Sequence, residues 1–282
     1  MRLVLRHSVL AIALALFASP SRAADPVATQ ATSLGRGPAI VFVHDLGASR
    51  NIWMPTARKL IGTNRVVMSD LPGHGESALP DPFSLEACGK ALGLLLAAQK
   101  PESTVIVAQG VGGIVALHAL QQNPSAARGL LLIDVPIRVT SEIPDQMRKY
   151  FDEALEENYD AFLKQLYSQA GRDSAESAAL YAQASLVPPV TMKGYMRSLF
   201  SADATKGLQT FKGRIELLTT GRYWPKDKDW PSVAKERGYP DPAAFTPTRM
   251  TSTGRFIAKD QPDSLAAVIT GLVERSIATK KP

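Results

Sequence analysis

The sequence contains a single cysteine, Cys88, among its 282 residues. One thiol cannot form a disulfide within the chain, so a fold that depends on internal disulfides is excluded. Cys88 shares a helical spacing with Leu85, Leu92 and Leu95, which is typical of a small residue in a hydrophobic core. We therefore expect a structural cysteine and no catalysis by a Cys-His pair.

The sequence also lacks an apolar run long enough to cross a membrane as a helix. A shorter apolar run, Val9–Ala18, follows two arginines and precedes small residues around position 22. This order of basic, apolar and small residues predicts a secretory signal peptide over residues 1–23, and hence a periplasmic or secreted mature chain. A buried amphipathic helix at the N-terminus is the alternative interpretation.

An excess of charge of one sign is missing as well. The formal net charge of +6 falls to +3 when the three basic residues of the predicted signal peptide are removed. The remaining lysines and arginines are interspersed with acids, apart from a short basic end at Lys280 and Lys281. Nucleic acids bind to clustered basic residues, so we predict no nucleic-acid partner.

Unbroken apolar runs alternate with helical patterns along most of the chain. Four runs have the composition of strands that are buried on both faces: Ala39–Val43, Val105–Ala108, Gly129–Asp134 and Ile215–Leu218. Strands that alternate with helices predict an α/β fold, with a mostly parallel sheet and helices on both faces. From about residue 137 to residue 210 the alternation stops and the pattern is helical, which indicates an inserted region.

The stretch Thr104–Leu120 combines a buried strand, a tight turn and a helix. Its turn reads A-Q-G-V-G over residues 108–112, which has the frame of the G-x-S-x-G turn that raises a catalytic serine above a sheet. The position of the serine is occupied by Gly110. Glycine relieves the backbone strain of such a turn, but it supplies no nucleophile.

Two further motifs precede this turn: F-V-H-D-L-G at residues 42–47 and D-L-P-G-H-G-E-S at residues 70–77. In this order and spacing, the three motifs resemble the α/β-hydrolase superfamily, in its esterase/lipase-like "alpha/beta hydrolase-1" branch. The resemblance implies a hydrolase core over residues 24–136 and 211–282. It also implies that the inserted helical region, residues 137–210, is a cap over the ligand pocket.

The resemblance assigns roles to individual positions. The N–H groups of Leu46 and Val111 would form the oxyanion hole, and Asp134 would be the acid of the catalytic triad. Arg255 stands where the family has the base histidine, and Asp45 stands where it has a glycine. A guanidinium keeps its proton near neutral pH, so Arg255 cannot act as the base, and we expect it to form an ion pair with Asp134.

These departures lead to three hypotheses about function. The first is a pseudoenzyme with a disabled Ser-His-Asp triad, which binds a small apolar or carbonyl/carboxylate ligand, or a protein partner, without catalysis. The second is an esterase-like hydrolase with a non-standard mechanism, in which Gln109, Asp45 and Asp134 hold a water. The third is a structural paralogue with no ligand. We predict the first.

The glycines that begin at Gly110 also invite comparison with the dinucleotide-binding pattern G-x-G-x-x-G. That pattern fails at its third glycine, where the sequence has Val115. We predict neither a cofactor nor metal ligands. The histidines outside the predicted signal peptide are His44, His74 and His118, and we expect each of them to be structural.

Overall fold

The computed structural model describes residues 27–138 and 144–277. Its strands form one sheet in the order β1-β3-β2-β4-β5-β6-β7, in which β1 is antiparallel to β3 and the other neighbouring pairs are parallel. The strands are β1 (Ala31–Leu34), β2 (Ala39–Val43), β3 (Arg65–Ser69), β4 (Thr104–Gln109), β5 (Gly129–Ile133), β6 (Arg214–Thr220) and β7 (Thr248–Met250). The predicted α/β class is confirmed.

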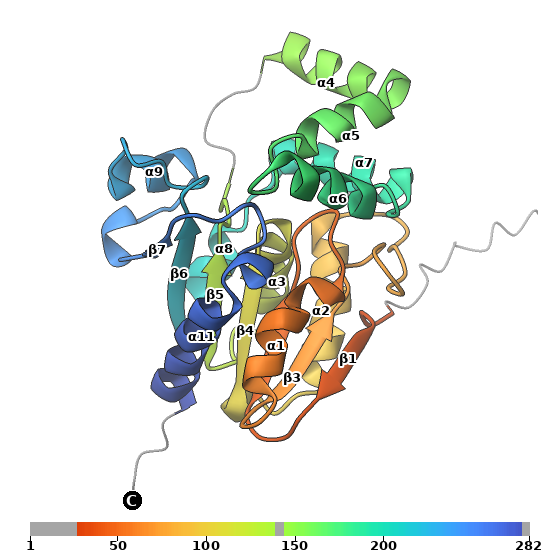
Figure 1. Ribbon diagram of the computed structural model, residues 1–282. Coiled ribbons are helices and arrows are strands. Elements are labelled where there is room, and N and C mark those ends of the chain that lie inside the picture. Colours follow the sequence, from red (N-terminus) through yellow and green to blue (C-terminus); the bar gives the residue numbers. More distant parts are fainter. Residues whose placement is uncertain (1–26, 139–143, 278–282) are drawn as a thin grey trace, which may run out of the picture.

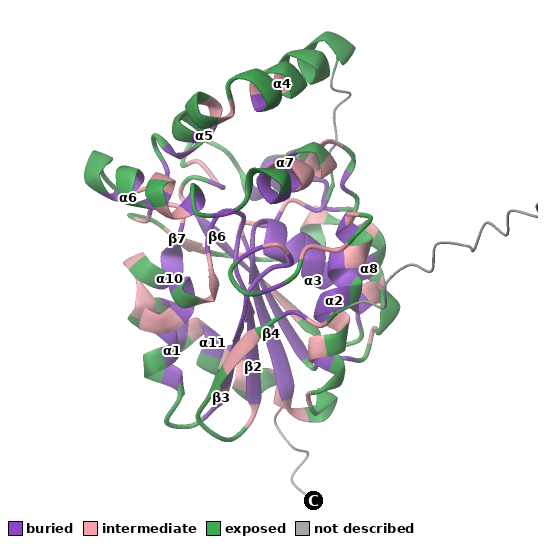
Figure 2. Cartoon of the chain, turned by 90° about the vertical axis from the view of Figure 1, so that its right-hand side faces the viewer, coloured by how far each residue is buried: buried purple, intermediate pink, exposed green. Residues whose placement is uncertain are grey.

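The centre of the sheet is formed by β2, β4 and β5, whose residues are all buried. Val41 of β2 is level with Val67 of β3 on one side and with Ile106 of β4 on the other. Apolar and β-branched side chains on both faces of a strand suit a sheet that is covered on both sides. Figure 2 shows these strands as the buried interior of the molecule.

Helices cover both faces of the sheet (Figure 1). On one face α3 packs against α2 and α8, and on the other α1 packs against α10 and α11. These helices are α1 (Met54–Leu60), α2 (Leu85–Ala97), α3 (Val111–Gln122), α8 (Thr205–Thr210), α10 (Ile257–Asp260) and α11 (Pro262–Ile277). A further helix, α9 (Trp230–Glu236), and the 3-10 turns η1 (Arg50–Trp53), η2 (Pro101–Ser103), η3 (Leu199–Ser201) and η4 (Pro242–Ala244) lie in connections.

The start of α2 follows the sequence pattern closely. Ser84 precedes the helix in an extended conformation, and its hydroxyl oxygen accepts the N–H of Ala87 at 3.0 Å. This contact satisfies a donor that the first turn of a helix otherwise leaves without a partner. Cys88 lies on the buried side of the same helix.

Four helices are grouped at one end of the sheet (Figure 1). They are α4 (Asp145–Glu157), α5 (Tyr159–Tyr167), α6 (Ser174–Ala184) and α7 (Pro189–Ser198). Most of α4 and α5 is exposed, whereas α7 has several buried residues (Figure 2). Among the described helices, none is long and apolar enough to cross a membrane. The predicted signal peptide, residues 1–23, lies outside the described residues.

Candidate functional site

The turn between β4 and α3 has the strand-turn-helix form that its sequence frame predicts. Gly110 joins the two elements with φ at 52°, a conformation that is strained for a residue with a Cβ. The helix that follows approaches the loop after β2 very closely, because a Cβ added to Gly112 would lie 2.2 Å from the carbonyl oxygen of His44. The absence of a side chain at Gly110 and Gly112 therefore allows the turn to pack closely against the loop after β2.

The side chain of Asp45 fills the space above Gly110. A Cβ added to Gly110 would lie 2.1 Å from Oδ1 of Asp45. This oxygen accepts the backbone N–H of Leu46 at 2.8 Å and that of Val111 at 2.9 Å. The structure thus brings together the two predicted oxyanion-hole donors, and both of them bind the carboxylate of Asp45.

The other carboxylate oxygen of Asp45 pairs with Arg255. Oδ2 lies 2.8 Å from Nε and 2.7 Å from Nη2 of the guanidinium. Burial opposes the charge of Arg255, but the nearby Asp45 carboxylate outweighs burial, so the pKa of Arg255 is raised above its ordinary value. The guanidinium therefore stays charged, and two of its nitrogens contact the same oxygen of the Asp45 carboxylate.

Our expectation of an Arg255–Asp134 ion pair is therefore wrong. Asp134 follows β5 with φ at 49°, and its carboxylate accepts the N–H of Thr220 at 2.8 Å and the hydroxyl of the same residue at 2.7 Å. Burial raises the pKa of Asp134 to about 6, although the two bonds from Thr220 act in the opposite direction. The arginine pairs with Asp45 because Gly110 has no side chain, and the Asp45 carboxylate occupies the space that this leaves.

Gln109 completes the surroundings of the pair. Its side-chain amide donates to the backbone carbonyl of Arg255 and so ties the end of β4 to the loop that carries the arginine. Its carbonyl oxygen, Oε1, is buried and has no hydrogen-bond partner among the described residues. A buried acceptor of this kind is usually satisfied by water or by a ligand.

Two buried histidines hold the loops on the far side of Asp45. His44 accepts the N–H of Leu71 at Nε2 (2.9 Å), and His74 accepts the N–H of Gly47 at Nε2 (3.3 Å). Burial lowers the pKa of His44 to about 4 and that of His74 to about 3, so both rings are neutral acceptors at ordinary pH. Their bonds to backbone agree with the structural roles that we expected.

Sequence reasoning missed one contributor, Tyr167 of α5. Its hydroxyl donates to the carbonyl oxygen of Leu46 at 2.8 Å, and its ring lies 5.4 Å from the guanidinium carbon of Arg255. Tyr167 therefore fixes the loop that carries Asp45 and also contacts the partner of that residue. Its sequence position reveals only a helical pattern, so no local signal connects it with residues 46 and 255.

Within the part of the chain that the structure describes, no group of three or more histidine, cysteine, aspartate or glutamate side chains could hold a metal ion. The residues that meet at this site present four kinds of group. They are a carboxylate, a guanidinium, two backbone N–H donors and the acceptor on Gln109.

Comparison with known proteins gives a family and several relatives. The profile of the "Alpha/beta hydrolase family" matches residues 40–268. A pimeloyl-[acyl-carrier protein] methyl ester esterase from Pseudoalteromonas atlantica is 32% identical over 103 residues, which span 36% of this chain and 38% of the relative. A protein of the same name from Chromobacterium violaceum is 24% identical over 247 residues, which span 83% of this chain and 85% of the relative.

Solved structures agree on the architecture. A hydrolase from Oleispira antarctica has a TM-score of 0.72 at 16% identity, and the match covers 87% of this chain and 94% of that one. The esterase RhEst1 from Rhodococcus has a TM-score of 0.68 at 16% identity, with the same coverage of 87% and 94%. At such low identity the likeness shows the fold alone.

The curated relatives contradict our prediction of a non-catalytic binder. Several of these relatives are named as esterases, both where the match is short and where it spans most of the chain, and none of the names indicates a pseudoenzyme with a disabled triad. The error lay in inferring inactivity from Gly110 and Arg255 alone. The alternative hypothesis, an esterase-like hydrolase with a non-standard mechanism, agrees better with these findings.

Proposed function

The chain belongs to the alpha/beta hydrolase family, and we propose from this premise that it hydrolyses carboxylic esters with Asp45 as the working carboxylate. The names of its curated relatives support ester hydrolysis as the reaction class. The residues at the site support a route that needs neither a serine nor a histidine. The substrate is an ester of a carboxylic acid, and the attacking group is water.

One observation carries the proposal: the carboxylate of Asp45 occupies the space in which a nucleophilic side chain on residue 110 would stand. A Cβ on Gly110 would lie within 2.1–2.7 Å of the three carboxyl atoms of Asp45. An acid-base group at this point is within reach of any carbonyl carbon whose oxygen binds the N–H groups of Leu46 and Val111. The proposed catalytic group thus comes from residue 45 in place of residue 110, but it occupies the same region of space.

Substrate binding requires the carboxylate to leave the two N–H groups that it accepts at rest. Hydrogen bonds to a charged acceptor contribute about 1.5–3 kcal/mol each. The ester carbonyl oxygen replaces Oδ1 on Leu46 and Val111, which recovers part of this energy. The recovery is complete only when the oxygen becomes negative, because the N–H groups bind an anion more strongly than a neutral carbonyl.

Chemistry then follows from the freed carboxylate. Asp45 takes a proton from a water that the Oε1 acceptor of Gln109 orients, and the resulting hydroxide attacks the carbonyl carbon. The tetrahedral intermediate places its negative oxygen on Leu46 and Val111. Its collapse expels the alkoxide, which takes the proton from Asp45, and the products are the free acid and the alcohol. Arg255 then pairs again with the ionised Asp45.

The test is hydrolysis of p-nitrophenyl acetate by the purified protein and by Asp45→Asn. General-base catalysis contributes about 100-fold or more to a rate, so we expect Asp45→Asn to lose at least that factor in kcat. Glu216→Gln is the control, because the Glu216 carboxylate also pairs with an arginine, at 2.8 and 2.9 Å from Arg275, but does not belong to the site. The control should keep the full rate.

A folding check accompanies the assay. Should Asp45→Asn fail to fold, as judged by circular dichroism, Gln109→Ala tests the same mechanism through the water site and should lower kcat with little change in KM. Two results overturn the proposal: a native rate that disappears with further purification, or a rate in Asp45→Asn or Gln109→Ala equal to that of the native chain.

A further inference from the structure

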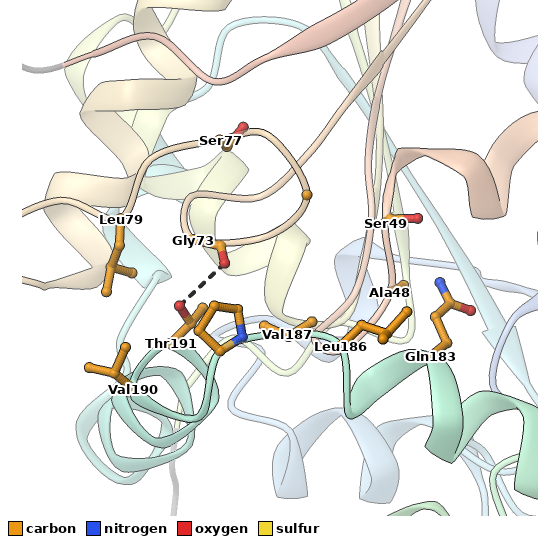
Figure 3. Close-up of a pocket in the computed structure, with 12 residues that line it drawn as sticks. Ala48, Ser49, Gly73, Ser77, Leu79, Gln183, Leu186, Val187, Val190 and Thr191 are labelled. Carbon is orange, nitrogen blue, oxygen red and sulfur yellow. Dashed lines mark hydrogen bonds between the residues drawn. The ribbon is translucent and has the colours of Figure 1, made fainter.

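A cavity of about 490 Å³ lies between the loop after β3 and the segment that joins α6 to α7 (Figure 3). Its volume falls within the range of about 300–1,000 Å³ that is usual for small-molecule sites. Neither Asp45 nor Arg255 lines it, and the turn at Gly110 does not reach it either. The cavity is therefore distinct from the candidate catalytic site.

One end of the cavity is apolar. Leu79, Val187 and Val190 line it, and the backbone of Gly73 comes so close that an added Cβ would lie 2.6 Å from the methyl group of Thr191. Val190 is 66% exposed at this end, and Leu186, which is 84% exposed, lies toward Gln183 in Figure 3.

The opposite end offers hydrogen bonds that the protein does not use. Among the described residues, neither the hydroxyl of Ser49 nor the side-chain amide of Gln183 has a hydrogen-bond partner. Figure 3 shows these two side chains on the side of the cavity away from Leu79 and Val190. A hydroxyl and a carboxamide can both donate and accept, so they suit a neutral polar group.

The other hydroxyl groups of the lining are already engaged. Ser77 donates to the carbonyl oxygen of Asp70 at 2.9 Å, and Thr191 donates to that of Gly73 at 3.2 Å. Among the lining side chains, the unused hydrogen-bonding groups are thus those of Ser49 and Gln183. A bound molecule with one polar group would therefore have one preferred orientation in the cavity.

No charged side chain lines the cavity in the described part of the chain. The nearest cation in sequence, Arg50, is already paired, since its guanidinium lies 3.3 Å from the carboxylate of Asp70 and also contacts Glu76. A ligand with a charge inside the cavity would lose its hydration without gaining an opposite charge. The lining therefore favours an uncharged ligand.

We propose that this cavity binds an uncharged amphipathic molecule. Its aliphatic part lies against Leu79, Val187 and Val190, and its single neutral polar group, a hydroxyl, amide or ester, bonds to Ser49 and Gln183. The site stands apart from the proposed ester hydrolysis, since its binding needs no contact with Asp45. A failure of either proposal is therefore visible without reference to the other.

The experiment is calorimetric titration of the full chain with 1-octanol and, separately, with octanoate at pH 7.5. We expect 1-octanol to bind at one site and octanoate to bind at least about tenfold more weakly, because its charge has no partner in the cavity. Ser49→Ala/Gln183→Ala removes the polar end and should weaken the binding of 1-octanol about tenfold, as expected for two neutral hydrogen bonds.

Two further variants locate the binding site. Val190→Asp places a charge at the rim and should also weaken 1-octanol binding, whereas Leu166→Asp makes the same change at an exposed position of α5 outside the cavity and should not. The proposal is overturned if 1-octanol does not bind, or if octanoate binds as tightly. It is also overturned if the cavity variants bind 1-octanol as tightly as the native chain does, or if Leu166→Asp weakens binding as much as Val190→Asp does.

Discussion

The interdependence of Gly110 and Asp45 can be measured as a coupling free energy. Gly110→Ser restores the serine that the family turn carries, but its new Cβ would lie 2.1 Å from Oδ1 of Asp45. The carboxylate must then leave its two N–H donors, which contribute about 1.5–3 kcal/mol each. The strain of a side chain at φ of 52° adds about 1–3 kcal/mol. We expect Gly110→Ser to lower the free energy of unfolding by about 4 kcal/mol or more.

The same substitution should be milder once the carboxylate is gone. In an Asp45→Ala background only the backbone strain remains, so Gly110→Ser should lower the free energy of unfolding by about 1–3 kcal/mol. The difference between the two backgrounds is the coupling energy. The two lost N–H bonds predict about 3 kcal/mol or more, which is at or above the upper end of the 0.5–3 kcal/mol typical of residues in contact. The assay is urea unfolding, followed by circular dichroism, of the native chain, the two single variants and the double variant.

A control substitution measures how far the two backgrounds differ for a position that does not contact Asp45. A Cβ added to Gly93 in α2 meets nothing within 4 Å, so Gly93→Ala should raise the free energy of unfolding by about 0.5–1 kcal/mol in both backgrounds alike. Equal effects of Gly110→Ser in the two backgrounds, within about 0.5 kcal/mol, would refute the reasoning. Such a result would mean that the carboxylate of Asp45 does not occupy the space above residue 110.

Two further predictions concern residues around the site. The pKa of Asp134 is raised to about 6 in the fold, so the folded protein holds a proton that the unfolded chain releases, and stability falls as pH rises from about 4 to about 6. Asp134→Asn should remove this fall, so that its free energy of unfolding rises by ~3 kcal/mol relative to that of the native chain between pH 4 and pH 7, as measured by urea titration. A difference between the two proteins that does not change with pH would contradict the raised pKa of Asp134. Tyr167→Phe removes the bond to the carbonyl of Leu46 and should lower the free energy of unfolding by about 1 kcal/mol, whereas an unchanged melting temperature would show that this bond does not hold the loop.

The sequence predicts the centre of the fold well because burial on both faces leaves a plain pattern. The apolar runs at Ala39–Val43 and Gly129–Ile133 are strands in the structure, and the turn at Gly110 lies between strand and helix as its frame indicates. The edge strand Ala31–Leu34 was not predicted. It pairs with β3 alone and its residues are exposed or half-buried, so its composition resembles that of a loop.

The partner of Arg255 could not be predicted for a different reason. Asp45 and Asp134 both follow strands of the parallel sheet, so both carboxylates are expected at the same edge. Arg255 is more than 100 residues away from each of them in the sequence, so the spacing does not predict which carboxylate it pairs with. The choice depends on the volume above residue 110, which is a property of the packed turn.

The three departures from the family pattern are best understood as one change. Gly110 leaves the space, Asp45 fills that space with a carboxylate, and Arg255 neutralises it at 2.7–2.8 Å. Removal of one partner from such a pair leaves a charge without compensation, which typically costs about 3–5 kcal/mol. Replacing any one of these residues by the family's residue therefore yields either a clash or an unpaired charge. For this reason each position, considered alone, looks like the loss of a catalytic group, whereas together they place a paired carboxylate in the space above residue 110.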